Sequence, residues 1–373
     1  MKGNDIIEMK ILYITTIGGT MPFFKLFIRD LLNKGVVVDI ASNNNLFPVP
    51  EYYREWGCKV FSLSCSRSPM DKGNLISIKE IRELVENNAY DIVHCHTPIA
   101  AACTRIACRH IRKKGSKVYY TAHGFHFYKG APLKNWILYY PMEWLCAHWT
   151  DVLVTINRED FVLAKKRMKA KCIEYVPGIG IDIEKFTKVK VDRTEKRREI
   201  GISDDAVLLL SVGELNKNKN HEVVIRALAK IGDYNIHYAI AGTGKLEEYL
   251  YKLALELGIE DQIHLLGFRD DLEEVYKIVD LYIHPSYREG LPVALMEAIA
   301  SKVPVIASNI RGCKDLIEEK YCFSPGSICD IVEKIKKALC LEDTKIAIEN
   351  NFKKLYNFSM LQVNKKLYEL YLM

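Results

Sequence analysis

Two glutamates stand eight positions apart in the segment PSYREGLPVALMEAIASKVPVIAS (285–308). Glu289 lies in an expected loop, and Glu297 lies in an apolar stretch with helical periodicity that we expect to begin at Pro292. Eight residues make just over two helical turns, so Glu297 points inward from the helix while Glu289 precedes its amino terminus. Unpaired N–H groups at a helix start bind anions. The spacing suits a ligand with hydroxyl groups on both sides of a phosphate, as in a nucleotide sugar; the competing interpretation is two solvated glutamates.

A lysine and two glycines of the same half could serve the same ligand. In VGELNKNKNHEVVIRAL (212–228), Gly213 ends an apolar run and Lys219 stands just before a helix. A lysine there could neutralise a diphosphate at the helix start, although a solvated basic loop has the same composition. In AGTGKLEE (241–248), Gly242 shapes a loop at a strand end, and the spacing of a P-loop is missing.

The first half carries candidates of its own. Gly18 and Gly19 follow the first apolar run and precede a helix expected near Pro22, where an α/β fold lets its backbone approach a ligand. The Gly-x-Gly-x-x-Gly pattern of NAD enzymes is missing there. Four histidines lie at expected strand ends: His94, His96, His123 and His126. Their spacing does not match a metal site, so we expect neither metal nor cofactor, and His123 is best placed to reach a ligand.

Short β-branched runs alternate with helical stretches along both halves. These runs are 10–17, 36–42, 58–64, 91–97, 117–123 and 151–157 in the first half, and 206–213, 235–242, 262–268, 281–286 and 303–308 in the second. The alternation predicts an α/β fold with two doubly wound, Rossmann-like domains, each built on a parallel sheet. Because such folds bind ligands at the carboxyl ends of their strands, we expect the sheets to face a central cleft.

A turn-rich segment, YVPGIGID (175–182), marks the expected domain boundary. We expect an N-terminal domain over 1–176 and a C-terminal domain over 177–357. The last segment, 358–373, has helical periodicity and could cross back to the first domain.

Composition limits the class of protein. A chain of 373 residues with 49% hydrophobic and 27% charged residues suits two domains with full cores. Eleven cysteines without a Cys-x2-Cys pair predict buried reduced thiols in a cytoplasmic protein. The longest apolar stretch of the first half, 136–149, is interrupted by polar residues and is too short to span a bilayer, so no transmembrane helix is expected.

The two halves differ in charge. Residues 1–176 hold 25 Lys and Arg against 16 Asp and Glu (+9), and residues 177–373 hold 28 against 31 (−3). Basic clusters at 105–117 and 165–171 accompany an aromatic segment at 125–149. This combination predicts contact with an anionic membrane surface. The competing interpretations are a nucleic-acid patch, which we do not expect, and an ordinary helix with core aromatic residues.

Together these motifs resemble the retaining family-4 glycosyltransferases of the GT-B fold, and among them the bacterial capsular and exopolysaccharide glycosyltransferases. The resemblance covers essentially the whole chain. Its most specific element is the Glu-x7-Glu segment at 285–308, supported by VGELNKNKN (212–220), HLLGFRDD (264–271), VPGIGID (176–182) and YYTAHGFHFYKGAP (119–132).

The resemblance implies roles for single residues in the Glu-x7-Glu segment. Glu289 would contact hydroxyl groups of the donor sugar, and Glu297 would contact the ribose of the nucleotide. The amides of Gly290 and Leu291 would bind the diphosphate, whereas Pro292 has no N–H to contribute. The remaining donor-binding glycines end or follow strands: Gly18, Gly19, Gly213 and Gly242.

Other residues match the family's pattern outside that segment, with one departure. Lys219 matches the phosphate-binding lysine and His123 the histidine beside the donor sugar, which makes them catalytic candidates together with the first glutamate. The backbone at Phe268 would read the base. The family places an arginine where this chain has Glu214, so either Arg288 or Lys217 replaces it, or Lys219 and the helix dipole suffice.

The implied reaction is transfer of a hexose or N-acetylhexosamine from a nucleotide sugar, expected to be a UDP-sugar, to a lipid-linked saccharide. The acceptor would carry a polyprenyl diphosphate or a related group, at the inner face of the cell membrane. We expect retention of anomeric configuration, independence of metal, and a leaving phosphate that helps to deprotonate the acceptor. The alternatives are a nucleotide-sugar 2-epimerase of the same fold and a non-catalytic nucleotide-sugar-binding protein.

Overall fold

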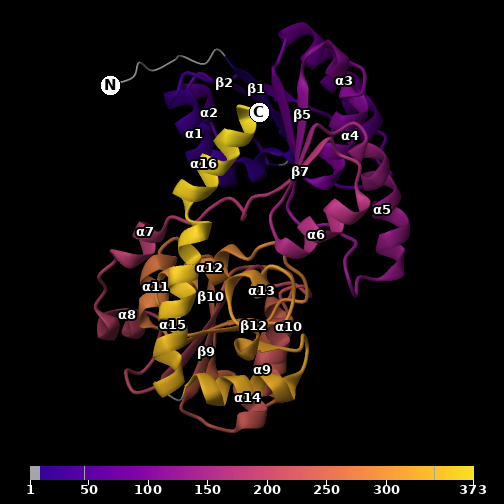
Figure 1. Ribbon diagram of the computed structural model, residues 1–373. Coiled ribbons are helices and arrows are strands. Elements are labelled where there is room, and N and C mark those ends of the chain that lie inside the picture. Colours follow the sequence, from indigo (N-terminus) through magenta and orange to yellow (C-terminus); the bar gives the residue numbers. More distant parts are fainter. Residues whose placement is uncertain (1–8, 46, 340) are drawn as a thin grey trace. The chain divides into compact units, whose positions relative to one another are not determined.

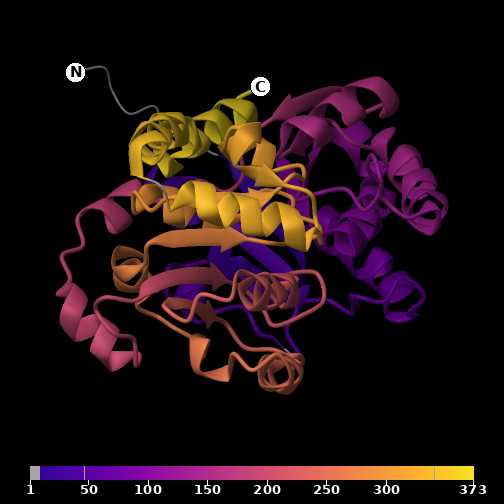
Figure 2. The ribbon, with the colours of Figure 1, turned by 90° about the horizontal axis from the view of Figure 1, so that it is seen from below.

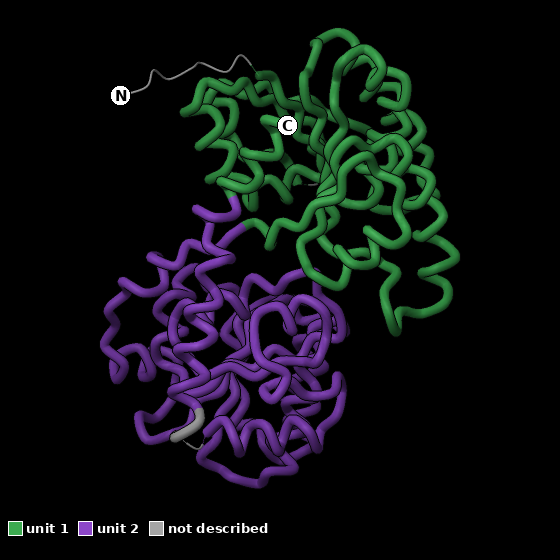
Figure 3. Tube along the Cα trace, viewed as in Figure 1, with its two compact units in different colours: residues 1–179, 364–373 green, residues 180–363 purple. Residues whose placement is uncertain are grey.

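The computed structural model describes residues 9–45, 47–339 and 341–373 and divides into two compact units (Figure 3). Unit 1 comprises Met1–Ile179 and Asn364–Met373, and unit 2 comprises Gly180–Val363. Each unit has its own parallel sheet and its own hydrophobic core.

Unit 1 is built on a seven-stranded parallel sheet in the order β3-β2-β1-β4-β5-β6-β7 (Figure 1). Its strands are β1 (Lys10–Ile17), β2 (Val37–Asn43), β3 (Val60–Ser62), β4 (Ile92–His96), β5 (Lys117–Ala122), β6 (Val152–Thr155) and β7 (Cys172–Tyr175). The strand order reverses between β1 and β4, which makes the carboxyl ends of these two strands the expected place for a ligand.

Helices connect the strands of unit 1 and cover its sheet. They are α1 (Lys25–Asn33), α2 (Tyr52–Glu55), α3 (Gly73–Asn88), α4 (Pro98–Cys108), α5 (Leu133–Ala147) and α6 (Arg158–Arg167). Helix α4 packs between α3 and α5. The strands read as continuous apolar runs because both faces of a parallel sheet are covered; Ile11, Leu12 and Ile14 of β1 are fully buried.

Unit 2 contains a six-stranded parallel sheet in the order β10-β9-β8-β11-β12-β13. Its strands are β8 (Val207–Val212), β9 (Ile236–Ala241), β10 (Ile263–Gly267), β11 (Leu281–His284), β12 (Val305–Ser308) and β13 (Cys322–Phe323). Here the order reverses between β8 and β11, so the expected ligand edge is formed by the loops that follow these strands.

Helices lie on both faces of the unit 2 sheet (Figure 2). They are α7 (Ile183–Thr187), α8 (Arg193–Glu199), α9 (His221–Ile231), α10 (Glu247–Glu256), α11 (Leu272–Ile278), α12 (Val293–Ala300), α13 (Cys313–Leu316), α14 (Ile328–Ala338) and α15 (Leu341–Leu355). Helix α9 packs against α10 and α14, whereas α12 packs against α11 and α15.

The last helix, α16 (Met360–Tyr371), begins in unit 2 and ends in unit 1. Met360 N donates to Ile181 O at 2.9 Å in unit 2. At the other end, the Tyr371 hydroxyl lies 2.6 Å from Tyr13 Oη, and Tyr119 Oη donates to Leu370 O at 2.6 Å. Side-chain and main-chain hydrogen bonds therefore attach the end of α16 to the sheet of unit 1.

The two doubly wound parallel sheets confirm the predicted fold class, and three details differ from the predictions. Strands β7 and β13 were missed because β7 is short and half polar and β13 has only two residues. The helix expected near Pro22 is a 3-10 helix over Gly18–Phe24, and α1 begins only at Lys25. Cys329 is exposed rather than buried; Cys340 lies outside the described residues.

Candidate functional site

The loop between β11 and α12 carries Glu289, and two side chains hold its carboxylate. Lys219 Nζ donates to Glu289 Oε1 at 2.7 Å, and His284 Nε2 lies 3.1 Å from the same oxygen. Lys219 precedes α9 and His284 ends β11, so the three side chains meet beyond the carboxyl ends of β8 and β11. This is the edge at which the strand order of unit 2 reverses, where α/β folds bind their ligands.

Glu289 is held as a carboxylate. Burial alone would raise its pKa, but the hydrogen bond from His284 and the positive charge of Lys219 outweigh burial and hold that pKa well below its usual range. Burial lowers the pKa of His284, whose ring is therefore neutral at pH 7. With Nε2–H donating to Glu289, His284 Nδ1 accepts from the Tyr282 hydroxyl at 3.1 Å. These bonds fix the direction of the Glu289 carboxylate.

Glu297 lies in the second turn of α12, in a different environment. The hydroxyl of fully buried Tyr276 lies 3.1 Å from Glu297 Oε2 and 3.0 Å from Ala294 O. Burial raises the pKa of the Glu297 carboxyl, and the Tyr276 hydrogen bond offsets only part of that rise. The two glutamates therefore differ in the stability of their charged forms.

The start of α12 differs by one residue from the prediction. Pro292 is the cap, with an extended backbone (φ −77°, ψ 111°), and Val293 is the first helical residue. The preceding loop is fixed by Arg311, whose Nε donates to Glu289 O at 3.1 Å. Gly312 has a φ of 78°, and a Cβ there would lie 2.4 Å from Gly290 O. Only a glycine allows this close approach to the loop.

Two predicted glycines make room for the site lysine. Gly213 has a φ of 154°, and a Cβ there would lie 3.1 Å from Cδ and Cε of Lys219. A Cβ on Gly242 would lie 2.0 Å from Gly213 O, which is closer than any real contact. Glycine at 242 therefore lets the loops after β8 and β9 pack together, and glycine at 213 accommodates the positive φ and leaves room for the Lys219 side chain.

The other predicted residues of unit 2 flank this cluster or lie apart from it. Leu291 is buried beside the cap of α12. The main chain of Arg288 accepts from Asn218 Nδ2 at 2.9 Å, and the Arg288 side chain makes no ion pair with a described residue. Phe268, directly after β10, is 82% exposed.

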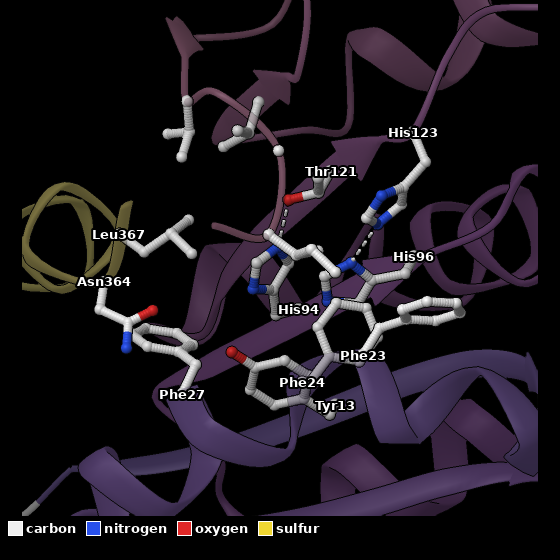
Figure 4. Close-up of a pocket in the computed structure, with 14 residues that line it drawn as sticks. Tyr13, Phe23, Phe24, Phe27, His94, His96, Thr121, His123, Asn364 and Leu367 are labelled. Atoms are coloured by element: carbon white, nitrogen blue, oxygen red, sulfur yellow. Dashed lines mark hydrogen bonds between the residues drawn. The ribbon is translucent and has the colours of Figure 1, made fainter. Parts of the chain in front are cut away.

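His123 lies in unit 1, directly after β5, within a group of histidines (Figure 4). Its Nε2 lies 3.1 Å from Nδ1 of His96, and burial lowers its pKa to about 4. His94, two residues before His96 on β4, bonds through Nε2 to Thr121 Oγ1 at 2.8 Å. No group of His, Cys, Asp or Glu among the described residues has the geometry of a metal site.

Gly18 and Gly19 begin the 3-10 helix after β1 and pack against a neighbouring loop. A Cβ on Gly18 would lie 2.3 Å from Val49 N, and Gly19 N donates to Phe47 O at 3.1 Å. These contacts alone account for glycine at position 18.

A cavity of about 270 Å³ opens at the reversal point of the unit 1 sheet. We call it the switch-point cavity; its lining includes Thr16, Arg67, Thr97, His126 and Tyr139. The rings of His126 and Tyr139 stack at 4.4 Å and form an aromatic wall. Arg67 supplies a positive charge, and none of the described residues that line the cavity is acidic.

Helix α5 turns an apolar face outward. Leu133, Ile137 and Leu138 are between 55% and 74% exposed, and Trp144 is also exposed. The inner face instead buries Glu143, which pairs with Arg105 of α4 at 2.8 Å. Among the described residues, no helix combines the length and the apolar character needed to cross a bilayer.

Sequence reasoning missed three residues of the unit 2 site. His284 and Tyr276 orient the two glutamates, and Arg311 fixes the loop before α12. A signal was present for His284, because a histidine that ends an otherwise apolar strand five residues before Glu289 lies within reach of it. Tyr276 and Arg311 come from other loops and helices and left no local signal.

Comparison with known proteins identifies the family of the chain. Residues 192–355 match the family described as "Glycosyl transferases group 1", and residues 10–156 match "Glycosyl transferase 4-like". A relative from Bacillus subtilis (strain 168), named "Putative glycosyltransferase EpsD", is 37% identical over 304 residues, which cover 80% of this chain and 77% of EpsD. An Escherichia coli UDP-Gal:alpha-D-GlcNAc-diphosphoundecaprenol alpha-1,3-galactosyltransferase is 27% identical over 72% of this chain and 71% of its own length.

Solved structures show the same fold. The crystal structure of Anabaena HepE in complex with UDP-glucose superposes with a TM-score of 0.79 at 18% identity, over 97% of this chain and 99% of that chain. The lipopolysaccharide glycosyltransferase WaaG gives a TM-score of 0.72 at 18% identity, over 96% and 99% of the two chains. The chain therefore belongs to the group 1, family-4-like glycosyltransferases and has their two-domain GT-B fold.

Proposed function

We propose that the protein transfers a hexose or N-acetylhexosamine from a UDP-sugar to a lipid-linked saccharide during exopolysaccharide, O-antigen or related cell-surface glycan synthesis, with retention of anomeric configuration. The observation that carries the proposal is the fixed carboxylate of Glu289 beside Lys219 at the ligand edge of unit 2. The galactosyltransferase relative named for a diphosphoundecaprenol acceptor supports the class of acceptor. The UDP-glucose complex of HepE supports the class of donor.

Lys219 and the start of α12 provide the positive charge that the leaving diphosphate needs. The Lys219 ammonium has three N–H groups, of which one bonds to Glu289, so two can donate to phosphate oxygens. The helix start adds unpaired amides and its dipole. Arg288 lies directly before Glu289 in the same loop and could stand in for the arginine replaced by Glu214. These groups support transfer without a divalent metal, which we include in the proposal.

Glu289 is proposed to hold hydroxyl groups of the donor sugar, and Glu297 the ribose. A carboxylate whose pKa is depressed stays ionised and accepts hydrogen bonds from hydroxyl groups throughout the reaction. It is a poor general acid for the same reason. The pair therefore suits binding of the donor better than acid–base catalysis.

The switch-point cavity is the proposed place for the acceptor saccharide in unit 1. Its aromatic wall of His126 and Tyr139 can pack against the apolar face of a sugar ring, and Arg67 can bind an anionic group. Two threonine hydroxyls, of Thr16 and Thr97, lie at the ends of β1 and β4.

The outward face of α5 is proposed to lie on an anionic membrane surface at the inner face of the cell membrane. The face presents leucine, isoleucine and tryptophan side chains, and the half of the chain that contains it carries a net charge of +9. Interfacial helices bind through this combination of apolar area and basic charge. A lipid-linked acceptor would then be reached without leaving the bilayer.

The decisive experiment incubates the protein with a panel of UDP- and GDP-sugars and a polyprenyl-diphosphate-linked saccharide, and identifies the product and its anomeric configuration by NMR. Glu289→Ala should abolish transfer while nucleotide binding persists, and Glu297→Ala should weaken nucleotide affinity. Failure of transfer with every donor by the folded protein would overturn the proposal. Epimerised donor without transfer would support the 2-epimerase alternative instead.

A further inference from the structure

We propose that His96 is a positioning residue that fixes the tautomer of His123: His96 Nδ1–H donates to His123 Nε2, so that His123 carries its own proton on Nδ1 and presents it to the ligand. The proposal rests on the proposed function and on the role that the family resemblance implies for His123, that of the histidine beside the donor sugar. The place of His96 at the end of β4 and its distance from His123 in the sequence do not by themselves predict this role.

The two rings are brought together by adjacent strands. His96 is the last residue of β4 and pairs in register with Thr121 of β5, two residues before His123. This register places His96 Nδ1 3.1 Å from His123 Nε2, within hydrogen-bonding distance (Figure 4). One of the two nitrogens must carry the proton of this bond.

Burial decides which nitrogen donates. His96 is 2% exposed, and its Nε2 has no hydrogen-bond partner among the described residues. If His96 Nδ1 accepted, the His96 proton would sit on Nε2 as a buried N–H without a partner, which is rarer in proteins than an acceptor with a free lone pair. The arrangement with His96 Nδ1–H as the donor avoids that orphaned N–H.

The neighbours of His96 hold its ring in place without competing for the bond. His94 uses both of its nitrogens, Nδ1 with Tyr371 Oη at 2.5 Å and Nε2 with Thr121 Oγ1 at 2.8 Å. The His94 ring lies 4.2 Å from the His96 ring, and the Phe24 ring lies 4.3 Å from the same His96 ring. His96 is thus clamped by its neighbours, and its bond to His123 is its only ring hydrogen bond within the described chain.

The second nitrogen of His123 is left for a ligand. His123 Nδ1 makes no hydrogen bond with any described residue, and the side chain is partly exposed. Burial lowers the pKa of both rings, so both are neutral near pH 7 and each carries one proton. A neutral imidazole whose Nε2 accepts must donate from Nδ1. That N–H is a fixed donor for a sugar hydroxyl.

Long-range ¹H–¹⁵N correlation NMR of the ¹⁵N-histidine-labelled protein reads the tautomers directly, without substrate. We expect the protonated-nitrogen signal of His123 at Nδ1 in the wild type. Replacement by His96→Asp, whose carboxylate can only accept, should move that proton to Nε2. A wild-type His123 protonated at Nε2 would overturn the inference, whichever donor and acceptor the protein uses.

Kinetics of three variants separate positioning from packing. His96→Asn keeps an amide N–H at the place of Nδ1 and should retain most of kcat, whereas His96→Asp should lower kcat by about 10–100-fold with a smaller change in KM. His94→Gln removes a ring that packs against His96 but keeps the His96–His123 bond, so it should lower stability and reduce kcat less than His96→Asp does. An active His96→Asp beside an inactive His96→Asn would show that His96 accepts. If His123→Ala left transfer unchanged, the proposed role of His123 would fail, while the NMR result would still decide the tautomer.

Discussion

Replacing Glu289 and Glu297 by glutamine is expected to change the free energy of unfolding in opposite directions. The two residues have the same side chain and lie eight positions apart. Glu289 accepts from Lys219 at 2.7 Å and has a depressed pKa, whereas Glu297 is half-buried beside Tyr276 and has a raised pKa. Glu289→Gln should destabilise the protein at pH 7, and Glu297→Gln should stabilise it.

The expected loss of stability in Glu289→Gln follows from the hydrogen bond between Glu289 and Lys219. A hydrogen bond to a charged group contributes about 1.5–3 kcal/mol. The Lys219 side chain keeps 23% exposure, so its ammonium can regain water when the carboxylate is lost. We therefore expect Glu289→Gln to lower the free energy of unfolding by about 2 kcal/mol. For a unit of this size, that loss lowers Tm by about 4–8 °C.

The pH dependence has a defined sign for each variant. Because the folded pKa of Glu289 lies below the unfolded value of about 4.3, its stabilisation is present above that pH and is lost as the pH falls through the folded pKa. The folded pKa of Glu297 lies above the unfolded value, so its charged form opposes folding once the pH rises through the folded pKa. The difference in free energy of unfolding between each variant and the wild type should therefore become smaller as the pH falls towards about 3.

Urea unfolding of wild type and both variants at pH 7 and pH 3.5 measures these differences. Glu256→Gln on the exposed face of α10 is the matched control and should change the free energy of unfolding by less than about 0.5 kcal/mol. Loss of stability in both site variants at pH 7 would refute the assignment of a raised pKa to Glu297. A free energy of unfolding of Glu289→Gln equal to that of the wild type would refute the stabilisation that we attribute to the Lys219–Glu289 ion pair.

Three further predictions test the proposed chemistry, the core and the membrane surface. Lys219→Ala should lower kcat on the order of 10²–10³-fold because a fixed charge at the diphosphate is lost; a turnover assay that finds normal kcat would contradict this role. Arg105→Met leaves the buried Glu143 side chain without its cationic partner and should lower the free energy of unfolding by about 3–5 kcal/mol in urea unfolding, and a loss below about 1 kcal/mol would contradict a stabilising role of this ion pair. The double change Ile137→Ser and Leu138→Ser should reduce the fraction of protein that floats with anionic vesicles, while binding to neutral vesicles stays low for both proteins. Equal binding of variant and wild type to anionic vesicles would show that α5 does not contact the membrane.

The fold was predictable because local periodicity carries it. Every long parallel strand appeared as a β-branched run, and most predicted bounds fall within two residues of the strands in the structure. The Glu-x7-Glu spacing also located the main cluster, since Glu289 lies in the loop and Glu297 on the helix that follows. Both features depend on residues close together in the chain, which is the information that a sequence pattern holds.

The partners of the site residues were not predictable in the same way. Lys219 and Glu289 are 70 residues apart and meet only because β8 and β11 are neighbours in the sheet. The prediction that Pro292 begins the helix was wrong because its fixed φ suits both a cap and a first helical residue, and ψ alone decides between them. The opposite pKa shifts of the two glutamates depend on such long-range partners and could not be read from their spacing.

The attachment of α16 to unit 1 sets an order in which the protein can be completed during synthesis. Unit 1 contains Met1–Ile179 together with Asn364–Met373, so its chain is interrupted by all of unit 2. While the ribosome makes residues 180–363, the hydroxyls of Tyr13 and Tyr119 and the ring of His94 lack the partners that Leu370 and Tyr371 later supply. The first unit to be translated is therefore the last to be finished, and the histidine group around His123 reaches its final packing only when the end of α16 leaves the ribosome.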